Sequence, residues 1–135
     1  MTIKNNYLEN EFCEYWIDEN GIIHEIFKST FGEINLEIAK IITRGRLEVS
    51  NGIYRPLFVE LGDAVKMDRA ATRYFSSGES MYFLNATGIL IKDQIEKFGV
   101  NIYIKFFTPK VPTKVFTSKE KALFWLLQHR TDALN

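Results

Sequence analysis

The stretch that decides the fold is "RPLFVELGDAVKMDRAATRYF", residues 55–75. Its segment 56–61 is short and almost continuously apolar, which is typical of a strand covered on both faces. A charged loop follows, and Asp68 can then cap a helix over 69–77 that ends before Gly78. In an open parallel sheet, the junction between a strand and its following helix is the usual position of a ligand.

The residues before this stretch predict a hairpin and a helix. Two β-prone runs, about 14–18 and 22–28, flank Asn20-Gly21, a pair that favours a type I′ turn with positive φ at both residues. Asn35 can cap a helix over 34–52. The inner stripe of that helix is Ile38, Ile41, Ile42, Gly45 and Val49, and the missing side chain of the glycine allows a close approach to the sheet.

The residues after it continue the alternation. We expect a strand over 82–91, a helix over 93–107 and a short strand over 109–116. Val100 to Phe106 also alternate as in a strand, so the sequence leaves that alternative open for the predicted helix. A final helix begins at the capping box Thr117-x-x-Glu120.

Strands that alternate with helices indicate an α/β fold. We predict a single domain with an N-terminal β-hairpin and a mostly parallel sheet covered by about four helices, joined by right-handed crossovers. A chain of 135 residues fits one domain. The expected boundaries are an N-terminal extension at 1–13, the domain at 14–128 and a C-terminal tail at 129–135.

The overall charge argues against purely electrostatic partners. Lys and Arg number 17 and Asp and Glu 17, so we expect neither nucleic-acid nor acidic-membrane binding. A neutral chain favours self-association, for example as a homodimer. The N-terminus has no signal sequence and no apolar run approaches ~20 residues, so we expect a cytoplasmic protein without a membrane span.

Three stretches resemble the STAS superfamily, and especially its SpoIIAA-like branch of anti-sigma-factor antagonists. They are "RPLFVELGDAVKMDRAATRYF", "ATGILIK" and "PTKVFTSKEKALFWL". The resemblance covers about residues 14–128. It implies a STAS-like fold and a regulatory protein-interaction module.

The resemblance also directs attention to the loop after the central strand. STAS regulators carry a phosphorylatable Ser or Thr there, at the start of the following helix. Here the loop 62–68 has no hydroxyl and instead places acidic side chains at the helix start, where they suit the helix dipole. Candidate binding residues are Asp63, Lys66, Asp68 and Arg69, and the simpler alternative is plain helix capping.

Reactive residues form no recognisable motif. His24 and His129 lie far apart and lack the spacing of metal ligands, and Cys13 has no CxxC partner. No glycine-rich phosphate loop is present. We therefore expect no metal, no cofactor and no enzymatic activity.

A second candidate surface is the predicted helix 93–107. It would be apolar on nearly all sides, so Val100, Tyr103, Ile104 and Phe107 are candidates for a hydrophobic interface with a second copy, a partner or an acyl chain. The alternatives are a helix deep in the core and a strand.

These observations favour a non-enzymatic, STAS-like protein-interaction module that lacks the usual phosphorylation site. The alternative is a small-molecule or lipid carrier, in which some of the 11 Phe residues line an apolar pocket. A third reading, an enzyme, requires an acid–base pair that converges in a cleft with perturbed pKa values.

Overall fold

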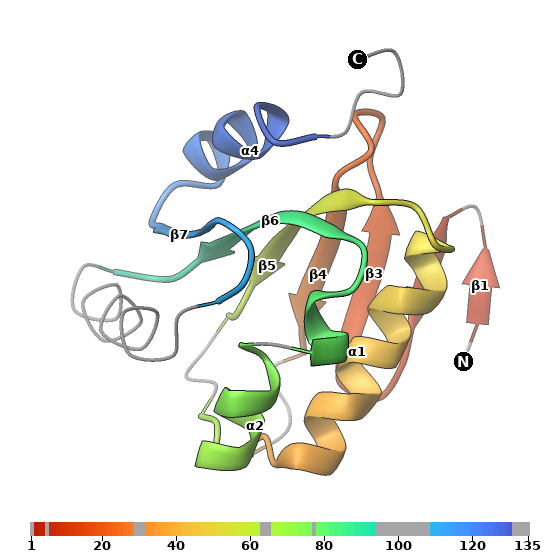
Figure 1. Ribbon diagram of the computed structural model, residues 1–135, viewed down its shortest axis with the longest axis vertical. Coiled ribbons are helices and arrows are strands. Elements are labelled where there is room, and N and C mark those ends of the chain that lie inside the picture. The colour runs from red at the N-terminus through yellow and green to blue at the C-terminus, as the bar shows by residue number, and fades with distance from the viewer. Residues whose placement is uncertain are drawn as a thin grey trace.

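A sheet that is seven-stranded in the described part of the chain forms the centre of the fold (Figure 1). This computed structural model describes residues 2–4, 6–28, 32–62, 66–76, 78–93 and 109–130. The strands are β1 (Thr2–Lys4), β2 (Tyr7–Glu9), β3 (Cys13–Ile17), β4 (Ile23–Phe27), β5 (Arg55–Glu60), β6 (Leu84–Leu90) and β7 (Thr113–Phe116). The helices are α1 (Leu36–Ser50), α2 (Arg69–Tyr74), the 3-10 helix η1 (Gly78–Met81) and α4 (Lys119–Leu127).

The order of strands in the sheet follows the order in the chain. Strands β1 to β4 pair antiparallel, whereas β4, β5, β6 and β7 pair parallel. The α/β class is confirmed, but the sheet is mixed rather than mostly parallel. The reason is that Thr2–Lys4 and Tyr7–Glu9, expected within an N-terminal extension, form two further antiparallel strands, of which β2 pairs with β3 and β1 pairs with β2.

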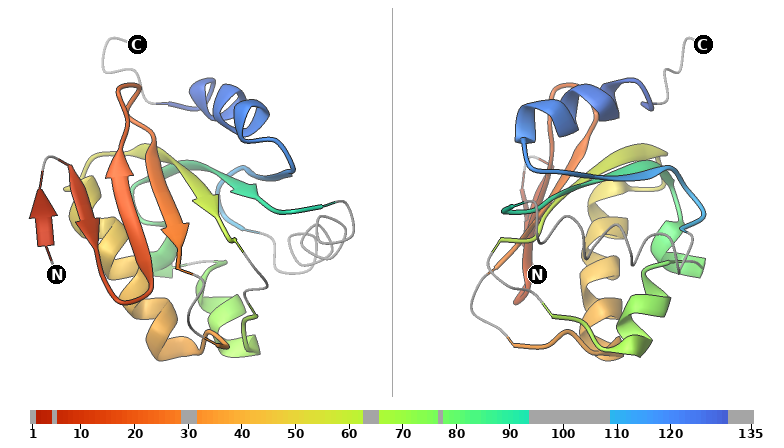
Figure 2. Two further views of the ribbon diagram at one scale, coloured as in Figure 1. Left: turned by 180° about the vertical axis from the view of Figure 1, so that it is seen from behind. Right: turned by 90° about the vertical axis from the view of Figure 1, so that its left-hand side faces the viewer.

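The helices cover the two faces of the sheet unequally (Figure 2). Helix α1 connects β4 to β5, while α2 and η1 connect β5 to β6. Crossovers of one hand that advance across a sheet in one direction lie on one face, and α1, α2 and η1 do so. Helix α4 follows β7 and covers the opposite face, so each face has its own apolar cluster.

The number of helices differs from the expected four. Three α-helices and the short η1 lie within the described ranges. The expected helix 93–107 falls, apart from residue 93, outside them.

The N-terminal hairpin forms where the sequence predicts it, but its turn is different. Strands β3 and β4 flank a loop in which Gly21 alone has positive φ, at 82°, so the turn is not type I′. The Asp18 carboxylate accepts hydrogen bonds from the backbone N–H groups of Asn20 and Ile22 at 2.9 and 3.0 Å. Asp18 therefore organises a longer loop than a two-residue turn needs.

Two of the three expected helix caps are confirmed. Asn35 caps α1 through the backbone N–H of Ile38, and Asp68 caps α2 through that of Ala71, each at 2.9 Å. In α4 the cap is Ser118 rather than Thr117, one residue later than expected.

The inner face of α1 contains a close contact with the sheet. A Cβ atom built on Gly45 would lie 2.6 Å from the ring of Tyr15, so only glycine permits this approach. The prediction for Gly45 is confirmed. The rest of the predicted stripe also faces the sheet, because Ile42 and Val49 are buried and Ile38 and Ile41 are partly buried and pack against the same cluster. Arg46, which the stripe did not include, is buried as well.

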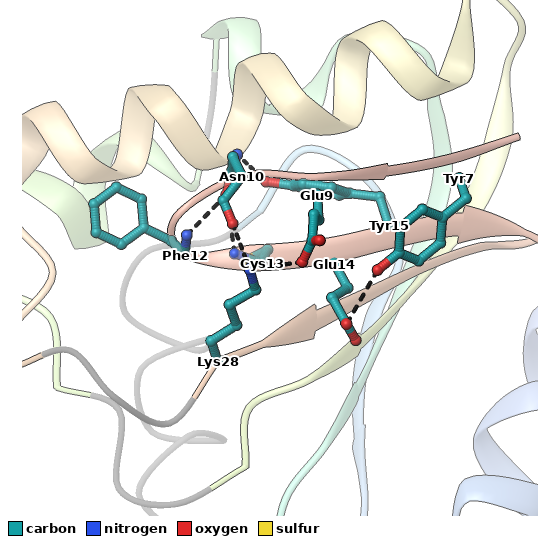
Figure 3. A network of polar contacts seen from close by, with 8 residues as sticks. All are labelled: Tyr7, Glu9, Asn10, Phe12, Cys13, Glu14, Tyr15 and Lys28. Carbon is teal, nitrogen blue, oxygen red and sulfur yellow. Dashed lines mark hydrogen bonds and ion pairs between the residues drawn. The ribbon is translucent and has the colours of Figure 1, made fainter. Parts of the chain in front are cut away.

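A polar network fixes the N-terminal strands under α1 (Figure 3). The Asn10 amide oxygen accepts hydrogen bonds from the backbone N–H groups of Phe12 and Cys13, both at 2.9 Å. The Tyr15 hydroxyl accepts one from the Asn10 amide at 3.1 Å and donates one to the carbonyl of Ile42 in α1 at 2.8 Å. Every side-chain polar atom of Asn10 and Tyr15 has a partner. We call the contacts of these two residues the sealed network, because they leave no side-chain polar atom unpaired.

Candidate ligand-binding site

A cavity of about 300 Å³ lies between the sheet and the helices α1, α2 and η1. Strands β4, β5, β6 and β7 form one wall, and the three helices form the other. The sheet wall is mainly apolar and includes Phe27, Leu57, Val59, Leu84 and Ile89. The helix wall is more polar and includes Thr43, Arg46, Thr72, Phe75, Ser80 and Met81.

Alternation along β4 turns one carboxyl group into this space. Ile23 and Phe27 join the apolar cluster under α1, so Glu25 between them faces the same side of the sheet. Glu25 is only 5% exposed. Glu25 is therefore an ionisable residue at a core-facing position of the strand.

The carboxyl group of Glu25 stands apart from the other buried polar groups of the cavity wall. In the described part of the chain, no hydrogen bond or ion pair joins it to another residue. Burial raises the pKa of Glu25 to about 7, although the positive charge of Arg46 acts in the opposite direction. Near neutral pH this carboxyl group therefore exists in both protonation states.

Arg46 on the opposite wall is buried but well coordinated. It is 2% exposed, and its Nη1 and Nη2 groups donate hydrogen bonds to the carbonyls of Tyr82 and Ser80 at 2.8 and 2.9 Å. These bonds fix η1 and the residues after it against α1. Burial lowers the pKa of Arg46, but a guanidinium stays protonated in proteins. The cavity thus contains a fixed cation and a titratable carboxyl group that do not contact each other.

The hydroxyl groups around the cavity divide into two kinds. Those of Thr72, Ser80 and Thr113 donate hydrogen bonds to the backbone carbonyls of Asp68, Tyr74 and Val111, respectively. The hydroxyl of Thr87 in β6 is buried without any partner, and the residue is 8% exposed. Among the wall residues that the structure describes, the Glu25 carboxyl group and the Thr87 hydroxyl group make no hydrogen bond to another described residue.

Comparison with known proteins places the domain in a family. A model for a domain of unknown function, DUF7793, matches residues 15–130. The chain belongs to the DUF7793 family. No curated protein matches it.

One solved structure shows the fold of this DUF7793 domain. An uncharacterised DUF3478-family protein with a SpoIIAA-like fold from Shewanella loihica PV-4 superimposes with a TM-score of 0.53, over 89% of this chain and 90% of that one, at 15% identity. A protein of unknown function from Arthrobacter sp. FB24 is 17% identical over 90% of this chain and 92% of that one, with a TM-score of 0.30. The resemblance to the SpoIIAA-like branch is confirmed at the level of fold.

The predicted loop site is only partly within the described residues. The side chain of Asp68 caps α2, and its backbone N–H donates a hydrogen bond to the carbonyl of Ile34. Lys66 and Arg69 are exposed, and Asp63 lies outside the described residues. The structure confirms the capping interaction of Asp68, and a binding role for this loop stays a prediction.

The predicted hydrophobic interface cannot be placed on the structure. Val100, Tyr103, Ile104 and Phe107 all lie outside the described residues.

The other reactive side chains have structural partners. His24 faces the α4 side, where its Nε2 lies 2.9 Å from the Asp18 carboxylate and its ring stacks on Trp16 at 5.0 Å. Cys13 is fully buried, and this burial raises the pKa of its thiol. Among the described residues, no group of three or more His, Cys, Asp or Glu side chains could hold a metal ion. No described helix is long and apolar enough to cross a membrane.

Sequence reasoning missed Glu25, Arg46 and Thr87. A signal for two of them was present. Glu25 occupies an inward position of the apolar run "IIHEIF", and position 46 lies four residues after Ile42 and three before Val49 on the inner stripe of α1. Charged residues at core-facing positions are rarely buried without a reason, so both marked a functional candidate.

Proposed function

We propose that this DUF7793 domain binds a small amphipathic molecule in the cavity under α1. The observation that supports this most directly is an unpartnered, buried carboxyl group facing an unfilled space. Protein interiors are close-packed and their buried polar groups are paired, and an exception to both rules at one place is typical of a binding site. The proposal gives priority to the carrier hypothesis over the interaction module.

The size of the cavity limits the ligand. A dry apolar cavity of ~150 Å³ admits a benzene molecule. The cavity here, at about 300 Å³, has roughly twice that volume. It suits a short aliphatic chain or a bicyclic ring system, not a long-chain lipid.

Filling the cavity tests the proposal. We would measure thermal unfolding with and without 1-octanol, a small neutral amphiphile. A ligand present at 100 times its Kd stabilises the folded state by about 2.7 kcal/mol, so the unfolding temperature of the wild type should rise. Val59→Phe places a larger side chain in the sheet wall and should abolish that rise.

A matched variant on the other face is the control. Leu90 packs against the cluster under α4, and Leu90→Phe should leave the effect of 1-octanol unchanged. Native mass spectrometry of the purified protein adds an independent readout, because a retained natural ligand appears as added mass. An absence of added mass, together with no response to 1-octanol in the wild type, would show that the cavity is not a binding site.

A protein-interaction role is the second candidate. It is supported by the SpoIIAA-like fold and by the exposed side chains of Lys66 and Arg69 beside the capped start of α2. Charge reversal at both positions should then eliminate capture of a partner protein, while Val59→Phe should not. Self-association through 100–107 stays a prediction, and light scattering of a Tyr103→Ser, Phe107→Ser variant checks it.

A further inference from the structure

The charges on the described lining of the cavity balance when Glu25 is ionised. Glu25 and Arg46 are the charged residues among its described lining side chains, and both are more than nine-tenths buried. Arg46 is compensated locally by two backbone carbonyls, whereas Glu25 has no donor. In the described wall, the charged group that lacks a hydrogen bond is therefore the Glu25 carboxylate, which needs a donor, whereas the other unpaired group, the Thr87 hydroxyl, is neutral.

An apolar ligand cannot meet this requirement. It would displace water from the carboxyl group and leave it desolvated without a partner, which is unfavourable for a neutral group and more so for a charged one. A ligand with a donor at one end satisfies the carboxylate and places its apolar part over Val59 and Leu57, the neighbours of Glu25 on β5.

A charged ligand would disturb the balance. A carboxylate ligand would add a second negative charge beside Glu25. An ammonium group would neutralise Glu25 and leave a net positive charge, that of Arg46, in a poorly solvated space. A neutral head that donates hydrogen bonds avoids both penalties.

We propose that the cavity selects neutral amphiphiles, with a primary amide or hydroxyl head bound by Glu25, over carboxylates and amines of the same chain length. This inference rests on the proposed function and specifies the chemical class of its ligand.

Three probes of equal chain length test this selectivity. They are octanamide, octanoate and octylammonium, and the affinity of each is measured by isothermal titration calorimetry at a pH well above the pKa of Glu25, where that carboxyl group is ionised. Octanamide should bind at least about tenfold more tightly than either ion, a difference of about 1.4 kcal/mol. Equal affinities for all three would overturn the selectivity while leaving the binding function intact. A failure of all three probes and of 1-octanol would overturn both.

Glu25→Gln should largely remove the preference for octanamide over octanoate. The variant leaves Arg46 as the sole charged residue among the described residues of the wall, so octanoate should gain about tenfold relative to octanamide. Glu60→Gln is the matched control, because Glu60 lies at the partly exposed end of β5 and does not line the cavity. An unchanged ratio of octanamide to octanoate affinity in Glu25→Gln would show that Glu25 does not contact the ligand.

A shorter carboxylate provides a second variant if Glu25→Gln folds poorly. Glu25→Asp keeps the charge but withdraws it by one methylene group. It should weaken octanamide binding and keep the preference for octanamide over octanoate. Unchanged octanamide affinity in a folded Glu25→Asp variant would contradict direct contact.

Discussion

Two polar clusters lie between the sheet and α1, and they differ in one property. In the sealed network, formed by Asn10 and Tyr15, each side-chain polar atom has a partner within the protein. In the cavity wall, Glu25 and Thr87 have none. The first arrangement is that of a structural contact and the second that of an unoccupied binding site, although the same helix covers both.

The difference originates in how closely α1 approaches the sheet. Beside β3, Gly45 lets the helix backbone lie against the ring of Tyr15. Farther across the sheet, over β4, β5 and β6, the helices do not fill the space, and the cavity remains. Packing density, rather than residue type alone, therefore separates the two clusters.

The largest expected effect is a pH dependence that comes from the cavity. The pKa of Glu25 is raised from 4.5 to about 7 on folding, so the folded state retains a proton that the unfolded state releases. Stability should therefore fall as the pH rises from about 4.5 through about 7, by about 3 kcal/mol in total. Urea unfolding at several pH values should show this fall in the wild type and in Glu60→Gln, and its absence in Glu25→Gln. An equal fall in all three proteins would show that Glu25 is not the group responsible.

A smaller loss of stability should follow when a methyl group is added between α1 and the Tyr15 ring. Gly45→Ala places a methyl group against the Tyr15 ring, and overpacking of this kind costs about 1–3 kcal/mol even though alanine favours a helix. Chemical denaturation should show a loss near 2 kcal/mol. Gly32→Ala is the control, because a Cβ there meets no atom within 4 Å. Equal stability of the two variants would contradict the close contact.

Removing one hydroxyl from the sealed network should destabilise the protein. Tyr15→Phe deprives the Ile42 carbonyl and the Asn10 amide of a buried partner. The expected loss is about 1–2 kcal/mol, measured by urea unfolding. A loss below a few tenths of a kcal/mol would mean that water replaces the hydroxyl and that this end is not sealed.

Removing one hydroxyl from the cavity wall should instead raise the free energy of unfolding. Thr87→Val replaces an unpartnered buried hydroxyl with a methyl group of similar shape. The free energy of unfolding should rise by up to about 1 kcal/mol, in contrast to the loss in Tyr15→Phe. The pair of variants compares the two clusters with nearly isosteric changes, and destabilisation by both would remove the distinction.

The sequence predicts the helices and strands better than it predicts the cavity between them. Local patterns in the sequence are enough to predict the alternation of strands and helices and the hairpin at Gly21. They also predict the helix caps at Asn35 and Asp68 and the role of Gly45. The strands β1 and β2 were missed because three residues are too few to show a pattern.

The cavity was missed for a different reason. Periodicity tells which face of a strand Glu25 occupies, but not whether the helices above that face leave a gap. The gap depends on the positions of α1, α2 and η1 together, and contacts between distant segments, such as Arg46 with Ser80 and Tyr82, set those positions. No window of the sequence contains these partners at once.

The most direct measurement is an NMR experiment on the methyl-labelled protein with octanamide. Intermolecular NOEs report which methyl groups lie against the ligand. The account predicts NOEs from the octanamide chain to the methyl groups of Val59 and Ile89 in the cavity, and none to Ile22 or Leu126 on the opposite face. NOEs confined to the opposite face, or none in the presence of excess ligand, would contradict it.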